Sequence, residues 1–306
     1  MNNIKTIKIF TIGVLTGACL FGAFSFTENG NDAPLKVLDG ERLQYKWYPP
    51  ATPSVMSFAG EKVPLGRWDV KERMDREIRV NTYAHSHLLY ILKLSSRIFP
   101  ELEKRLRLNG IPEDFKYLCV AESSLQNPTS SAGAVGYWQF MRATALQFGL
   151  EINDEVDERY DLDKATDAAC QYLKQAYNKF GTWTAAAASY NCGMGGFSNQ
   201  STFQQSDDYY DLLLPEETNR YVFRILALKA IIDDPEKYGY YIPQSDAYSP
   251  VRTRDILATS NIPNLAEFAL HHGTTYKILK ILNPWLRDRS LTINSKKSYI
   301  LKLPAD

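Results

Sequence analysis

Apolar residues recur at helical spacing from Trp68 to Ile232, and this stretch contains almost no alternating strand pattern. Prolines, glycines and polar loops divide it into six to eight predicted helices. The clearest of them lie in AHSHLLYILKLSSRIF, PELEKRLRLNG, a segment opening at Pro112, YWQFMRATALQFG, DKATDAACQYLKQAYNKFG, TAAAASYN and PEETNRYVFRILALKAII. Because nothing here can build a sheet, the pattern predicts a mainly α domain over residues 67–240.

The pattern changes after a breaker-rich segment that ends near Pro250. A short strand is predicted at Thr253 to Leu257, and KSYILKLP predicts a closing strand. Between them, NLAEFALHHG and TYKILKILN predict two short helices. This order predicts a small α+β domain of β-α-α-β type over residues 250–306.

The N-terminus is predicted to be an export signal rather than part of the fold. Two lysines precede the apolar run from Ile9 to Phe26, and Ala23-Phe24-Ser25 is a small-x-small cleavage site, so residues 1–25 are the expected signal peptide. A lipoprotein-type box at Thr16 to Cys19 and an uncleaved membrane anchor are the alternatives. All three place the mature chain outside the cytoplasm. Residues 26–66, rich in Pro, Gly and Asn, are expected to form a linker or extended arm.

Charge balance and histidine spacing exclude two classes of function. Lys plus Arg and Asp plus Glu number 35 each, so the chain has no basic field for nucleic acid. His85 and His87 are two apart and His271 and His272 are adjacent, so neither pair has metal-ligand spacing, and no CxxC occurs. We expect no nucleic-acid partner, no metal and no cofactor.

Removal of the signal leaves three cysteines, Cys119, Cys170 and Cys192. An oxidising compartment permits one disulfide among an odd number, and the sequence does not select the pair.

A glutamate occupies a position where a core residue is expected. In the helix that opens at Pro112, the apolar stripe beginning at Phe115 reaches Glu122 seven residues later. Burying an unpaired carboxylate costs several kcal/mol or forces its protonation. No Lys or Arg lies one turn away, although Arg142 or Arg220 could supply a distant partner. Glu122 is therefore either a buried ion pair or a functional acid.

Further segments are expected to present polar groups rather than to pack, although each residue alone has an ordinary structural explanation. Gly136 to Gln139 is expected to open a helix after a glycine-rich loop. Asn191 is expected to end an alanine-rich helix before CGMGG breaks the chain. Tyr221 lies on an apolar helical stripe and could be a core tyrosine.

Four motifs follow one another in the order YLCVAESSL, SAGAVGYWQFMRATA, AAASYNCGMGG and LPEETNRYVFRIL. Together they resemble the soluble lytic transglycosylase (SLT) domain of glycoside hydrolase family 23, and most closely the membrane-bound lytic murein transglycosylase D type. The resemblance extends over roughly half the chain, back to about Trp68. Ser189 replaces the usual Ala, and Trp138 stands where many relatives have Met; neither change removes a group that the chemistry needs.

The resemblance implies a lysozyme-like fold and a lyase reaction on peptidoglycan. Family members cleave the β-1,4 bond between N-acetylmuramic acid and N-acetylglucosamine without water and leave a 1,6-anhydromuramoyl end. Glu122 would be the only acid/base, with its pKa raised by desolvation to about 6. The C6 hydroxyl of the sugar would be the nucleophile, so we expect no second carboxylate at the site. Tyr221 would orient Glu122.

The resemblance assigns the other candidates to substrate binding: Ser123, Gln139, Tyr190, Asn191, Tyr221, Trp138 and Tyr137. The C-terminal unit resembles a degenerate LysM module, carried by LAEFALHHGTTYKILKILNPWL and YILKLP, without the usual Gly-Asp of the first turn. LysM modules bind N-acetylglucosamine-containing glycans; the alternative is a structural cap.

The expected partner is therefore the glycan strand of peptidoglycan, and the expected location is the periplasm, with membrane attachment through the N-terminus left open. Two alternatives remain: a lysozyme-type hydrolase on the same fold, and a non-catalytic glycan-binding protein of the cell wall.

Overall fold

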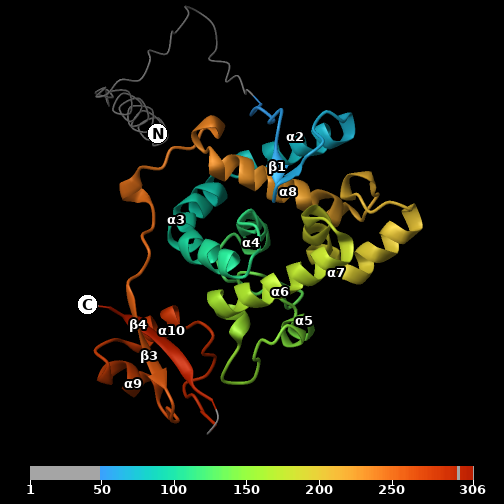
Figure 1. Ribbon diagram of the computed structural model, residues 1–306. Helices are drawn as coiled ribbons and strands as arrows, with labels where there is room; N and C mark the ends of the chain where they lie inside the picture. The colour runs from blue at the N-terminus through green and yellow to red at the C-terminus, as the bar shows by residue number, and fades with distance from the viewer. Residues whose placement is uncertain (1–48, 295–296, 306) are drawn as a thin grey trace, which may run out of the picture. The chain divides into compact units, whose positions relative to one another are not determined.

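The computed structural model describes residues 49–294 and 297–305 (Figure 1), and Pro49 onward forms one compact unit. The expected signal peptide, its two alternatives and the first part of the expected linker lie outside the described residues. Among the described residues, no helix has the length and apolar character needed to cross a membrane.

Seven α-helices lie between Trp68 and Asp233, a range that is described throughout: α2 (Trp68–Thr82), α3 (His85–Leu108), α4 (Phe115–Ser123), α5 (Arg142–Gln147), α6 (Leu162–Phe180), α7 (Trp183–Gln204) and α8 (Glu216–Asp233). Figure 1 shows the short helix α4 enclosed by α3, α6, α7 and α8. Phe115 and Leu118 of α4 are fully buried in the common core. The prediction of a mainly α domain is confirmed.

Helix α3 is one helix where the sequence predicts two. It runs through Pro100, which the sequence analysis places at the start of a second helix. A proline inside a helix costs about 3 kcal/mol because it removes a hydrogen bond and crowds the preceding turn. Pro100 is exposed, while Ile98 and Leu102 on either side of it are buried in the core. Burial of one continuous apolar face offsets the cost.

The helix predicted in YWQFMRATALQFG begins only at Arg142, so its first part is wrong. Residues 136–139 form a turn closed by a bridge between Val135 and Phe140. Gly136 has a φ of 89° and Gln139 a φ of 48°. Both values are left-handed, and a right-handed helix cannot contain them.

Helix α7 breaks near the predicted place and then resumes. Gly193 has non-helical backbone angles, φ 76° and ψ 149°, two residues after the predicted end at Asn191. The segment beyond it continues to Gln204, where the sequence predicts only a chain break. Phe197 explains the continuation, because its side chain is fully buried.

The described end of the predicted linker is packed against the helices. Strands β1 (Ser57–Phe58) and β2 (Glu61–Lys62) form a small antiparallel hairpin, and the Phe58 side chain is fully buried. The Glu61 carboxylate accepts hydrogen bonds from the backbone N–H groups of Trp183 and Thr184, at 2.6 and 2.9 Å. A carboxylate here satisfies unpaired donors at the start of α7, so this segment is part of the domain.

The C-terminal segment has the predicted β-α-α-β order: β3 (Thr253–Ala258), α9 (Leu265–His271), α10 (Tyr276–Leu282) and β4 (Tyr299–Pro304). The strands pair antiparallel, with Leu257 opposite Ile300. The unit has its own core, and Val156 of the preceding domain contributes to it. Short 3₁₀ helices complete the described chain: η1 (Glu158–Tyr160), η2 (Tyr209–Asp211), η3 (Glu236–Tyr238) and η4 (Gln244–Asp246).

Candidate active site

Glu122 stands at the last turn of α4, where the helix emerges from the core. Phe115 and Cys119 on the same stripe are fully buried, whereas Glu122 is half-buried. The chain leaves the helix through Ser124, which has a left-handed conformation with φ 54°. The predicted stripe is therefore correct, and its final position brings a carboxyl group from the core to the surface.

Tyr221 of α8 meets this carboxyl group. Its hydroxyl donates a hydrogen bond to Oε1 of Glu122, and its side chain is only 2% exposed. Burial raises the pKa of Glu122 to about 7, while the Tyr221 hydrogen bond and the nearby Arg224 charge oppose part of that rise. Close to neutral pH, Glu122 can therefore both donate and accept a proton.

The alternative of a buried ion pair at Glu122 is wrong. Arg142 donates to the carbonyl of Ile152 at 3.2 Å, and Arg220 pairs with Glu77 at 2.7 Å. No salt bridge reaches Glu122 from any residue that the structure describes.

A second carboxylate lies near Glu122, contrary to expectation. Glu217, one turn before Tyr221 in α8, contributes a negative charge that adds to the raised pKa of Glu122. It belongs to the LPEETNRYVFRIL motif, so its presence could have been read from the sequence. The Glu217 side chain is 63% exposed and lies 3.4 Å from the Arg224 guanidinium. Its solvated, charge-paired setting differs from the half-buried setting of Glu122.

Tyr190 and Asn191 of α7 face the same region. Burial raises the pKa of Tyr190, and the neighbouring Glu122 charge adds to that rise. The Tyr190 hydroxyl donates to the carbonyl of Trp138 at 2.8 Å, and Asn191 Oδ1 accepts from Thr218 Oγ1 at 2.8 Å. Thr218 donates to the amide oxygen of Asn191, so this contact does not use the two amide N–H donors of Asn191. Thr218 was not among the predicted site residues, although it lies three residues before Tyr221.

The remaining predicted site residues contact the protein itself. Ser123 is buried and donates to the carbonyl of Cys119 at 3.2 Å. Gln139 Nε2 donates to the carbonyls of Pro128 and Gly136, at 3.1 and 2.7 Å. These two side chains brace the end of α4 and the neighbouring loop.

The aromatic pair in the loop has two different environments. Trp138 has no exposed surface, and its Nε1 donates to Thr166 Oγ1 at 2.9 Å. Its ring therefore packs in the core and has no exposed face in this structure. Tyr137 is half-buried, and its carbonyl oxygen accepts a weak hydrogen bond from the Cys119 thiol at 3.4 Å.

The loop that carries Gln139 packs against the segment before α6. Asn127 Nδ2 donates to the carbonyl of Tyr160 at 2.9 Å. The backbone at Gly136 lies so close to the carbonyl of Arg159 that a Cβ atom at Gly136 would overlap it. Glycine is therefore required there both for its positive φ and for the close approach.

The three cysteines in the described part of the chain are free thiols, so none of the possible disulfides forms among them. No group of three His, Cys, Asp or Glu side chains in the described ranges is placed to hold a metal ion.

Comparison with known families covers both parts of the chain. Residues 102–212 match the transglycosylase SLT domain, and residues 254–306 match the soluble lytic transglycosylase C-terminal LysM-like domain. The chain carries an SLT domain followed by a LysM-like domain. The expected resemblance and fold class are thus confirmed.

The chain is also similar to individual proteins. Two proteins named membrane-bound lytic murein transglycosylase D, from Escherichia coli strain K12 and Escherichia coli O6:H1, are each 26% identical to it over 244 residues. The match covers 77% of this chain and 52% of each relative, so the chain spans about half the length of these curated relatives. The matched SLT domain contains Glu122, whereas Tyr221 lies beyond it in α8.

Proposed function

We propose that this chain is a peptidoglycan lytic transglycosylase that cleaves the MurNAc-β-1,4-GlcNAc bond and leaves a 1,6-anhydro end. The observation that carries the proposal is the Glu122 carboxyl group, raised to a pKa of about 7 and hydrogen-bonded by Tyr221. It stands within an SLT domain, in a chain similar to two lytic murein transglycosylases. A non-catalytic binding protein would gain nothing from a carboxyl group with this pKa.

In the proposed reaction, protonated Glu122 gives its proton to the glycosidic oxygen as the C1–O bond breaks. The N-acetyl group of the substrate stabilises the positive charge that develops at C1. The ionised Glu122 then takes the proton of the C6 hydroxyl, whose oxygen attacks C1. Because this nucleophile is tethered to the reacting ring, no activated water is needed.

The other site residues have supporting roles in this proposal. Tyr221 orients Glu122, and Tyr190 and Asn191 shape the cleavage subsite, with the Asn191 amide N–H groups directed to the substrate. Gln139 keeps its side-chain oxygen for an N-acetyl N–H, while its amide nitrogen donates the hydrogen bonds that brace the loop. Ser123 positions the end of α4. Tyr137 offers a partly exposed ring to the glycan.

We also propose that the domains divide as the sequence suggests, with the catalytic part over 67–240, extended by residues 49–66, and the LysM-like part over 250–306. The LysM-like part binds N-acetylglucosamine-containing glycan. The murein substrate and membrane-bound state in the names of the relatives support export to the cell envelope, in the periplasm.

Digestion of purified peptidoglycan sacculi tests the proposal. The chain without residues 1–25 is expected to release muropeptides that are one water lighter than the products of a hydrolase, measured by mass spectrometry. Hydrated products would instead identify a lysozyme-type hydrolase, with Glu217 as the candidate second carboxylate. No release by the folded protein would favour a glycan-binding protein.

Tyr221→Phe is expected to shift the pH dependence in a defined direction. The Tyr221 hydroxyl lowers the pKa of Glu122, so its removal raises that pKa above about 7. Because the reaction starts from protonated Glu122, the alkaline limb of the kcat/KM profile should move to higher pH. Tyr240→Phe is the control, since it removes a hydroxyl that donates to Thr82. A limb that stays in place or moves to lower pH would contradict the role of Tyr221.

A further inference from the structure

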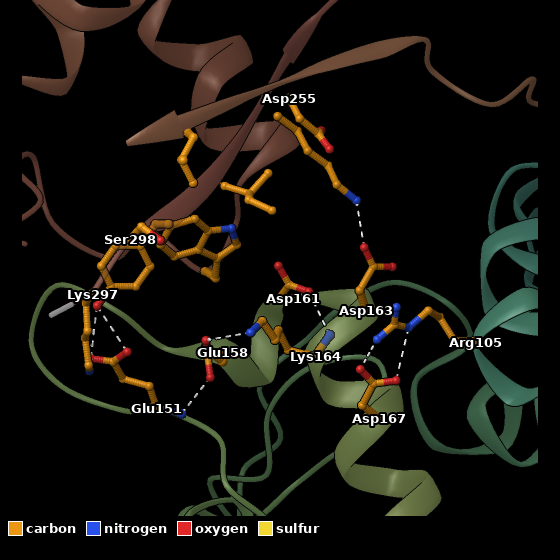
Figure 2. Close-up of a pocket in the computed structure, with 15 residues that line it drawn as sticks. Arg105, Glu151, Glu158, Asp161, Asp163, Lys164, Asp167, Asp255, Lys297 and Ser298 are labelled. Atoms are coloured by element: carbon orange, nitrogen blue, oxygen red, sulfur yellow. Dashed lines mark hydrogen bonds and ion pairs between the residues drawn. The ribbon is translucent and has the colours of Figure 1, made fainter. Parts of the chain in front are cut away.

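A cavity of about 530 Å³ is lined by residues on either side of Tyr160, whose carbonyl supports the Gln139 loop (Figure 2). One wall is η1 and the start of α6, and the opposite wall is formed by β3, β4 and the chain before β4. We call it the α6–β4 pocket; the residues used below are Asp161, Lys164, Asp255, Leu257, Trp285 and Ile300. Its volume suits a ligand of the size of a short peptide.

The pocket has more negative than positive charge. Six carboxylates and four cationic side chains line it, which leaves two carboxylates in excess. Three of the carboxylates are in close ion pairs: Asp163 with Lys302, Glu151 with Lys297 and Asp167 with Arg105. Asp161 and Asp255 have no ion pair with any residue that the structure describes.

Asp161 is the carboxylate that most needs a cation. Its Oδ1 accepts the backbone N–H of Lys164 as the N-cap of α6, and burial raises its pKa. In Figure 2 it lies beside Asp163 at the start of α6, opposite Asp255 on β3. The nearby Lys302 charge offsets part of this rise in pKa, but Lys302 is already paired with Asp163, so the desolvated Asp161 carboxylate still favours binding of a second positive group.

The pocket also offers a positive charge and an apolar wall. Lys164 is 61% exposed and stands 3.9 Å from its nearest carboxylate, Glu158, so it is available to a second anion. Leu257 and Ile300 face each other across the two strands and are both exposed. The Trp285 ring stacks on Tyr299 behind them, with ring centroids 5.5 Å apart.

We propose that the α6–β4 pocket binds the zwitterionic end of a peptide side chain, in which an ammonium and a carboxylate share one carbon. The ammonium is held between Asp161 and Asp255, the carboxylate by Lys164, and the alkyl chain lies on Leu257 and Ile300. This rests on the proposed function, because diamino acids with such ends occur in peptidoglycan peptides. The pocket then binds the peptide of the substrate, while the Glu122 site cleaves its glycan.

The proposal explains why the two domains meet through charged side chains. A contact that served only to join them would be expected to pair a desolvated charge such as that of Asp161, since unpaired buried charges are costly. Here Tyr160, next to the pocket, also carries the carbonyl that anchors Asn127 of the active-site loop. A bound peptide would therefore contact the same short segment that supports the loop.

Calorimetric titration of the full chain with the tripeptide L-alanyl-γ-D-glutamyl-meso-diaminopimelate tests the proposal. The tripeptide should bind. Two comparison probes should bind with an affinity at least about tenfold lower, because each loses a charged hydrogen-bonding group. One probe carries lysine in place of the diamino acid, and the other is acetylated on the distal amine. The double variant Asp161→Asn, Asp255→Asn should also weaken binding of the tripeptide about tenfold or more, and asparagine at 161 retains the helix cap.

Glu72→Gln, an exposed change on α2, is the matched control and should bind as the unchanged chain does. No tripeptide binding, or equal binding by the double variant or by both comparison probes, would overturn the proposal. Failure of the two proposals is distinguishable because cleavage of sacculi is measured separately. If the chain cleaves sacculi but does not bind the tripeptide, only the proposal for the pocket fails. If it binds the tripeptide but does not cleave sacculi, only the proposed transglycosylase activity fails.

Discussion

The Glu122→Gln variant is expected to lose cleavage of sacculi by about 10³-fold or more while keeping its fold. The amide has nearly the same shape and can still accept the Tyr221 hydrogen bond, but it cannot give up or take a proton near neutral pH. Replacing a half-buried carboxyl group of raised pKa by a neutral amide removes a desolvation cost, so the free energy of unfolding should not fall. The measurements are muropeptide release and the thermal unfolding midpoint.

Glu217→Gln separates the two enzyme mechanisms. As an exposed carboxylate paired with Arg224, Glu217 should contribute far less than Glu122 to a transglycosylase. If the Glu122→Gln and Glu217→Gln variants lost activity equally, a hydrolase with two catalytic carboxylates would become the better explanation. Substantial activity in Glu122→Gln alone would remove Glu122 from the mechanism.

The Gly136→Ala variant is expected to lose about 3 to 5 kcal/mol of stability. Part of the loss is the strain of an alanine at φ 89°. The larger part is the overlap of the new Cβ with the backbone carbonyl of Arg159, which cannot rotate away as a side chain could. Urea unfolding of the variant and the unchanged chain measures the difference.

Gly149→Ala is the matched control for this prediction. Gly149 has nearly the same backbone angle, φ 83°, and no atom lies within 4 Å of the position of its added Cβ. Its alanine should therefore cost only the strain of the left-handed conformation, about 1 to 2 kcal/mol. Equal losses at the two positions would show that the contact with Arg159 contributes nothing.

Local patterns in the sequence predicted much of the fold and the central residue of the site. The apolar stripe from Phe115 identified Glu122 because a heptad spacing within one helix needs no knowledge of distant contacts. The β-α-α-β order was readable for the same reason. The continuation of helix α3 through Pro100 could not be predicted in this way, because it depends on packing against core residues of other helices.

The backbone conformation of the loop around Gln139 could not be predicted from the sequence. Its positive φ is imposed by the bridge between Val135 and Phe140 and by the close approach to Arg159, and neither has a local signature. Trp138 was assigned to substrate binding through the family resemblance, and simple core packing was the alternative. Its burial results from packing against α6 and α7, with Thr166 and Tyr190 as its partners.

The hydrogen bond between Tyr221 and Glu122 joins residues 99 positions apart in the chain. During synthesis from the N-terminus, α4 therefore leaves the ribosome long before α8, and Glu122 lacks its orienting partner in every shorter nascent chain. Tyr221 also lies in the last helix of the domain, after every other predicted site residue. The proposed Glu122 site is thus complete only when almost the whole helical domain has been made.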